Sequence, residues 1–186
     1  MIGNSLAGIY GTGAPPIPPS SFESIATVTA AGGETSLSFG SISADYKSLQ
    51  IRILSRRTTG TTAIVQVQFN SDTASNYWWH YISGDGATAA ATNSGAATTS
   101  MRTFFMNSGT NVANQYGVGV IDILDYASTT KYKTLRSFGG NDQNATGRVS
   151  LTSGMWNSTA AVTSVEFSFL GDALAAGSTF ALYGVK

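Results

Sequence analysis

The chain of 186 residues contains no cysteine. This absence excludes a disulfide framework, a thiolate nucleophile and a cysteine-based zinc site. Charged residues are also scarce, at 11% of the chain, against about 25% in an ordinary soluble domain. Because Glu, Lys and Arg line the wet faces of helices, their scarcity disfavours a helical fold. Ten acidic and ten basic residues balance to zero formal charge, so neither nucleic acid nor a membrane is an expected partner.

The sequence also lacks the usual catalytic patterns. His80 is its one histidine, and no G-x-S-x-G segment prepares a serine nucleophile. A lone histidine does not supply the usual zinc ligands, so neither a metal nor another cofactor is predicted. Asp122 and Asp125 make a weak pair of carboxylates, and the end of a strand explains them more simply. We therefore predict no catalytic residues and a protein that is not an enzyme.

Short apolar runs bounded by Gly, Asn, Asp or Ser recur along residues 22–186. Their spacing of about ten to fifteen residues is typical of a sandwich rather than of β-α-β units. We expect one all-β domain of about ten strands, an antiparallel jelly-roll-like β-sandwich. Residues 25–30 and 36–39 are predicted to form a hairpin around Gly32 and Gly33.

The clearest half-buried strand is predicted where Val65, Val67 and Phe69 alternate with two glutamines. Residues 49–54, 162–170 and 179–185 show similar patterns. Residues 83–100 are mostly Ala, Thr, Ser, Gly and Asn, which are too small to bury a face. This stretch is predicted to be a long exposed loop.

Residues 1–21 predict an extended N-terminal arm. All four prolines of the chain lie in this segment, and Pro cannot donate to the centre of a sheet. We expect the arm to leave the core and to dock on a neighbouring subunit, although a frayed terminus is the alternative. The residues expected to make or shape this contact are Ile2, Leu6, Ile9, Tyr10, Pro15, Pro16, Pro18 and Pro19.

A cluster of bulky side chains at residues 77–81 is the other candidate contact site. A strand here places Trp78 and His80 on one face, and Tyr77, Trp79 and Tyr81 on the other. Five consecutive bulky residues cannot all point into a core, so some must meet solvent, a ligand or another subunit. A subunit interface is favoured over a glycan site, and His80 is expected to be packed or at that interface.

Several segments resemble small structural proteins of tailed bacteriophages. The segments are residues 22–29 (FESIATVT), 36–39 (SLSF), 46–52 (YKSLQIR), 69–72 (FNSD) and 180–185 (FALYGV). The resemblance extends over most of residues 22–186 and carries no catalytic motif. It implies a component of the virion, such as a minor tail or fibre-like protein or a head decoration.

The expected function is therefore that of a non-enzymatic virion subunit, associated with the tail or decorating the capsid, which docks through residues 1–21. Its expected partners are other virion proteins and further copies of itself, with a trimer favoured. The alternative is a module of a phage adhesion device that binds glycans of the host surface.

Overall fold

The computed structural model describes residues 21–60, 64–110, 112–143 and 146–186. The apolar and proline residues predicted to make the docking arm lie outside these residues. The described chain contains twelve strands, against about ten predicted, and no helix. The strands are β1 (Phe22–Thr29), β2 (Ser36–Phe39), β3 (Ser48–Ser55), β4 (Ile64–Phe69), β5 (Tyr77–Gly84), β6 (Ala89–Asn93), β7 (Met101–Phe105), β8 (Gly117–Leu124), β9 (Lys133–Asp142), β10 (Gly147–Trp156), β11 (Val165–Ser168) and β12 (Thr179–Val185).

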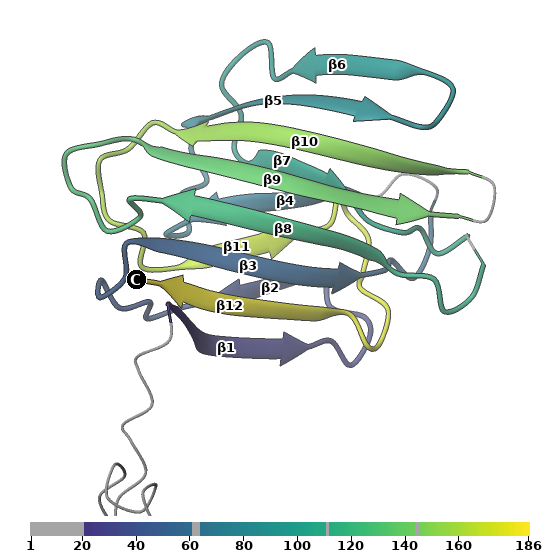
Figure 1. Ribbon diagram of the computed structural model, residues 1–186, viewed down its shortest axis with the longest axis horizontal. Helices are drawn as coiled ribbons and strands as arrows, with labels where there is room; N and C mark the ends of the chain where they lie inside the picture. Colours follow the sequence, from purple (N-terminus) through teal and green to yellow (C-terminus); the bar gives the residue numbers. More distant parts are fainter. Residues whose placement is uncertain (1–20, 61–63, 111, 144–145) are drawn as a thin grey trace, which may run out of the picture.

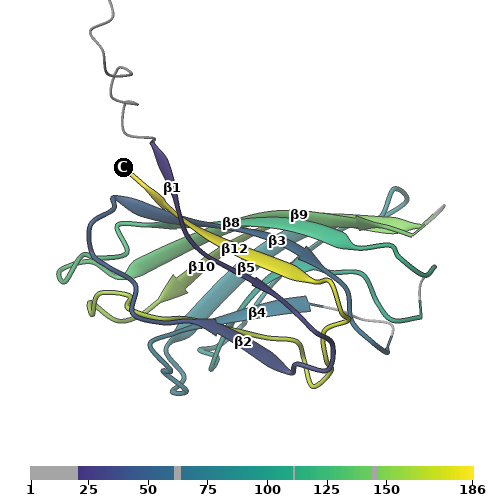
Figure 2. The same ribbon diagram turned by 90° about the horizontal axis from the view of Figure 1, so that it is seen from below.

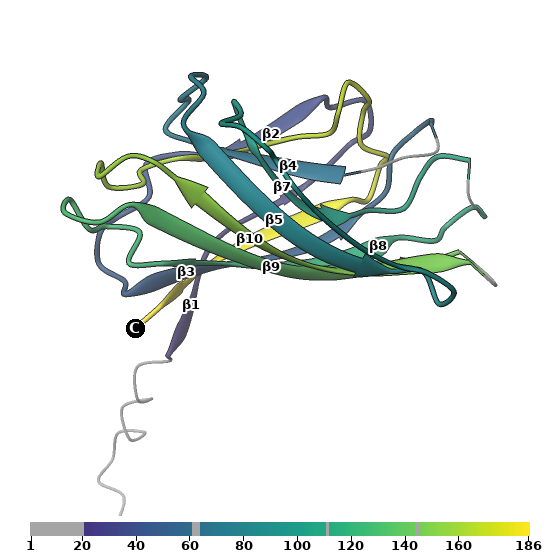
Figure 3. The same ribbon diagram turned by 90° about the horizontal axis from the view of Figure 1, so that it is seen from above.

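The strands form two antiparallel sheets that pack face to face. The larger sheet has eight strands in the order β1-β12-β3-β8-β9-β10-β5-β6, and the smaller has four in the order β2-β11-β4-β7. Figure 1 looks onto the larger sheet with the smaller one behind it, and Figures 2 and 3 show the two layers from opposite sides. The predicted all-β sandwich is confirmed.

The jelly-roll arrangement stays an interpretation, which the strand order favours. Strands β1, β12, β3 and β8 of the larger sheet interleave with β2, β11, β4 and β7 of the smaller one. Along the chain these strands alternate between the two sheets, except that β4 and β7 are neighbours in the smaller one. This is the order expected of a chain wound into two Greek keys. The hairpins β5–β6 and β9–β10 extend the larger sheet beyond this arrangement.

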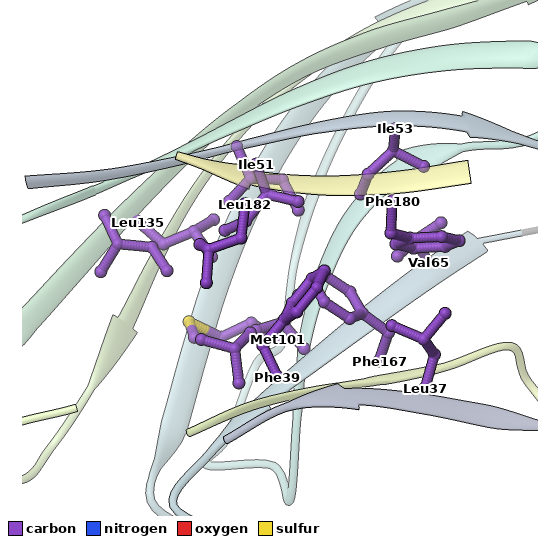
Figure 4. Close-up of a cluster of buried hydrophobic side chains, with 14 of the residues drawn as sticks. Leu37, Phe39, Ile51, Ile53, Val65, Met101, Leu135, Phe167, Phe180 and Leu182 are labelled. Atoms are coloured by element: carbon purple, nitrogen blue, oxygen red, sulfur yellow. The ribbon is translucent and has the colours of Figure 1, made fainter. Parts of the chain in front are cut away.

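The core lies between the sheets and follows the alternation of side chains along each strand. In β3, Leu49, Ile51 and Ile53 point inward and are buried, as the sequence predicts. In β4 of the other sheet, Val65, Val67 and Phe69 are buried and belong to the same core cluster. Figure 4 shows this layer of aliphatic and aromatic side chains from both sheets.

Phe104 of β7 lies in a groove made by two glycines of the larger sheet. A Cβ at Gly119 would stand 2.2 Å from the Phe104 ring, and one at Gly139 would stand 2.5 Å from it. Both distances are far below van der Waals contact, so any side chain at these positions would displace the ring. Gly119 and Gly139 are cross-strand neighbours in β8 and β9, and together they let β7 approach the larger sheet.

The predicted hairpin of residues 25–30 and 36–39 is wrong. Gly32 and Gly33 do turn the chain, with φ of +106° and +101°. The two flanking strands nevertheless belong to different sheets, since β1 pairs with β12 and β2 pairs with β11. The sequence identifies the turn but not the partner of each strand, because long-range pairing decides that partner.

The predicted exposed loop of residues 83–100 is also partly wrong. The segment is exposed, but β6 forms in it and pairs with β5 through five residue pairs. Gly86, with φ of +91°, begins a two-residue turn between the paired residues Asp85 and Thr88. The prediction assumed that residues too small to bury a face would not form a strand. A strand at the edge of a sheet can nevertheless form without burying a face.

Replacing Gly139 by Ala should lower the free energy of unfolding by about 1–3 kcal/mol, the usual cost of overpacking a core. The added methyl group would press on the Phe104 ring. Chemical denaturation monitored by tryptophan fluorescence measures the change. Gly40→Ala is the control, because nothing lies within 4 Å of a Cβ at Gly40. An equal loss from Gly139→Ala in a Phe104→Ala background would contradict this packing.

Candidate docking face

The outer face of the smaller sheet is polar. Two rows of paired residues cross it, Ser38 with Glu166 and Gln68 in one row and Ser36 with Ser168 and Gln66 in the other. The Gln66 side chain donates to the Ser100 hydroxyl, and the Gln68 side chain donates to the Thr99 carbonyl. This is the ordinary pattern of an antiparallel sheet, with one face in the core and the other in water.

The outer face of the larger sheet is different, because large apolar side chains gather at its centre. We call these the outer patch. Its members are all exposed, and they are Leu54, Ile82, Val118, Phe138, Val149 and Leu151. Phe138 is 58% exposed and lies in register with Leu151, which lies in register with Ile82. A hollow of about 750 Å³ opens beside Leu54, Val118 and Phe138.

The outer patch arises because the usual alternation is inverted in β9 and β10. The inward residues of β9 include Ser137 and Gly139, while Phe138 between them points outward. In β10, Ser150 and Thr152 are buried and Val149 and Leu151 are exposed. Sequence analysis missed these residues, since a period of two does not say which face is inside. The signal that could have identified them is the alternation of large apolar residues with small ones, Ser137 and Gly139 in β9 and Ser150 in β10.

A polar border lies beside the outer patch, in the next row of paired residues on the same outer face. The Gln50 side chain donates to the Asp122 carboxylate at 3.0 Å, and the Arg136 guanidinium lies 3.9 Å from it. His80 and Asn93 continue this row across β5 and β6. A hollow of about 540 Å³ opens between the polar side chains of His80, Asn93 and Arg136 and Ile82 of the patch.

The aromatic cluster of β5 is divided between the two faces as predicted. Tyr77 and Trp79 are buried, Trp78 and Tyr81 are half-buried, and His80 is exposed. His80 is not packed within this chain, and its place in an interface stays a prediction.

Tyr77 belongs to the core rather than to a binding surface. Its ring stacks on Trp156 with centroids 6.3 Å apart, and its hydroxyl accepts from the Phe69 amide and donates to the Asp72 carbonyl. Burial raises the pKa of the Tyr77 phenol to about 12. The Trp79 ring stacks on the Tyr81 ring, with centroids 5.8 Å apart.

The turn that follows β4 is built around the Asp72 carboxylate. It accepts hydrogen bonds from the Asn76 amide, the Trp156 indole and the Ala74 main-chain amide, at 2.9, 2.7 and 2.9 Å. These donors, the Asn76 side chain and then the indole above all, hold the pKa of Asp72 below its usual value, although burial opposes them. The turn therefore fixes the indole that stacks on Tyr77.

The described residues hold no group of three His, Asp or Glu side chains placed to bind a metal ion. The same part of the chain has no helix long and apolar enough to cross a bilayer. Asp122 and Asp125 are not brought together as a pair, because Asp122 contacts Gln50 within the sheet and Asp125 pairs with Lys131 at 2.6 Å after β8 has ended. The absence of catalytic residues and of a cofactor stays a prediction.

Comparison with known proteins gives no relative for this chain: no family model, no curated protein and no solved structure matches it. What the chain does must therefore be inferred from its own residues.

Replacing Asp72 by Asn should destabilise the fold by about 1–2 kcal/mol at neutral pH, since charge-assisted hydrogen bonds are weakened. The lowered pKa of the folded-state carboxyl means that its contribution is complete above the ordinary value of 3.8 and is lost as the pH falls through the folded pKa. The difference between parent and variant should therefore shrink in acid. Denaturation curves at several pH values measure it, and a difference that does not change with pH would contradict the role given to Asp72.

Proposed function

We propose that this chain is a non-enzymatic structural subunit of a larger protein assembly and that the outer patch is one of its contact surfaces. The observation that carries the proposal is the contrast between the two outer faces. One is polar throughout its paired rows, and the other exposes six large apolar side chains in one continuous area. Continuous exposed apolar areas with a polar border mark sites of protein contact.

The assembly that we propose is the virion of a tailed bacteriophage, in which the chain is associated with the tail or a fibre or decorates the capsid. The reason is the resemblance of segments within residues 22–186 to structural proteins of such phages. Docking through residues 1–21 is part of the same proposal. The described chain enters the larger sheet at Phe22 in β1, which forms one edge of that sheet, so an arm that precedes β1 would start at this edge.

Charge placed in the outer patch tests the proposal. We expect the double variant Phe138→Glu and Leu151→Glu to fold with a stability close to that of the parent, because both side chains are about half exposed. The variant should nevertheless fail to enter particles, since a buried contact would then enclose unpaired carboxylates. The measurement is complementation of virions that lack this chain, followed by quantification of the chain in purified particles.

The double variant Ser36→Glu and Ser168→Glu is the matched control, because it adds the same two charges, also at a pair of facing residues, to the polar outer face of the smaller sheet. It should enter particles normally. A variant that begins at Ser21 tests the arm in the same assay and should be lost from particles. Normal incorporation of the double patch variant would refute the contact surface, and absence of the parent chain from particles would refute the virion.

Glycan binding is a second candidate function, favoured by the hollow at the polar border. His80, Asn93 and Arg136 offer hydrogen-bonding groups there, beside apolar Ile82. If the hollow holds a sugar, Arg136→Ala should abolish glycan-array signals of the parent, while Ser38→Glu should leave them unchanged. Trp79 does not suit such a test, because it is buried and its loss would damage the fold. Silence of the parent on the array would exclude this candidate.

A further inference from the structure

The open edge of β6 carries main-chain groups in a self-complementary arrangement. Main-chain bonds join Asp85 to Thr88 at one end of the β5–β6 hairpin, and Ser94 to Trp79 at the other. Hydrogen-bonded and non-hydrogen-bonded pairs alternate along an antiparallel ladder. Counting inward from both ends, Ala90 and Thr92 bond to β5, while Ala89, Ala91 and Asn93 turn their N–H and C=O groups to the open side.

This edge lacks the devices by which proteins protect sheet edges. All five residues of β6 are exposed and none is charged or is proline, and their pairing with β5 shows no irregularity. Figure 1 shows β6 at the upper margin of the larger sheet, with no other strand of the described residues beyond it.

The other three edges are better protected. The opposite edge, β1, has a register shift between Ser24 and Ala26, and its Glu23 pairs with Lys186. Among the edges of the smaller sheet, β2 has only four residues. The other, β7, carries Arg102 and pairs with β4 through a register shift.

We infer that β6 pairs with β6 of a second copy of the chain, antiparallel and centred on Ala91. The residues whose main-chain groups point to the open side, Ala89, Ala91 and Asn93, are spaced symmetrically about Ala91. A two-fold axis at Ala91 therefore brings it opposite Ala91 of the second copy and brings Ala89 opposite Asn93. Each of these pairs can exchange two main-chain hydrogen bonds. The two larger sheets then form one continuous sheet.

The outer patch supports pairing of this edge with a second copy of the chain. Phe138, Leu151, Ile82 and Ala91 lie in one row of paired residues that runs to the open edge. Pairing about Ala91 continues this row into the second copy and joins two patches into one apolar area. The inference rests on the proposed function, since it names one partner in the assembly. It joins copies in pairs, whereas the sequence favoured a trimer.

Substitutions of Ala91 test the pairing in the full chain. Ala91→Pro removes an N–H that points to the open side and leaves the bonds of Ala90 and Thr92 to β5 in place. We expect the parent to dimerise in sedimentation experiments over a range of concentrations. The proline variant should raise the dimer dissociation constant by roughly tenfold, the effect of losing one main-chain hydrogen bond from each copy. Ala91→Val is the control, because it keeps the N–H and should still dimerise.

A charge pair at the same position tests the register. Because residue 91 would face itself across the axis, Ala91→Lys alone and Ala91→Glu alone should each weaken the dimer, and an equal mixture of the two should restore it as a heterodimer. A mixture no tighter than either variant alone would overturn the register.

A parent that stays monomeric, or a dimer that Ala91→Pro does not weaken, would overturn the edge pairing. Neither result bears on the entry of the patch variant into particles, so failure of the edge and failure of the proposed function are distinguishable. A dimer lost in Phe138→Glu but kept in Ala91→Pro would place the contact on the face rather than the edge, and would also overturn the inference.

Discussion

The contact of Phe104 with Gly119 and Gly139 determines which side of the larger sheet is inside. Only glycine leaves room for an aromatic ring directly on the backbone of β8 and β9. Once the ring lies there, strand alternation assigns every neighbouring residue to a face. Ser137 and Ser150 turn inward, and Phe138 and Leu151 turn outward. One aromatic contact between the sheets therefore leads to an apolar surface on the far side of one of them.

Much of the fold could be predicted from the sequence where hydrophobicity and burial agree. Val65, Val67 and Phe69 lie inward, and residues 179–185 form β12 as expected. The hairpin around Gly32 could not be excluded in this way, because the turn is real and only the distant strands β11 and β12 show that its two arms separate. Local chemistry indicates where the chain turns, and pairing between distant segments decides to which sheet it goes.

The candidate site was harder to predict for the same physical reason. The aromatic cluster of β5 attracts attention in the sequence, yet Tyr77 and Trp79 contribute mostly to packing. The outer patch draws on Leu54, Val118, Phe138 and three further residues from five strands, and these come together only when the order of the strands is known. A hydrophobic pattern alone places Phe138 and Leu151 in a core, because burying such side chains is the usual way to stabilise a sheet.

The two hairpins added to the larger sheet explain why the patch and the open edge occur together. The smaller sheet has only four strands, whereas β9, β10, β5 and β6 continue the larger sheet beyond its first four. Of these strands, β9, β10 and β5 contact β7, whereas β6 lies at the end of the larger sheet beside β5. Because β7 lies close behind β9 and β10, only small inward residues such as Gly139 and Gly154 fit there. Large apolar residues in this extension then stabilise the protein most when something outside covers them. Incomplete burial within one chain is thus the physical basis for expecting a second protein surface against it.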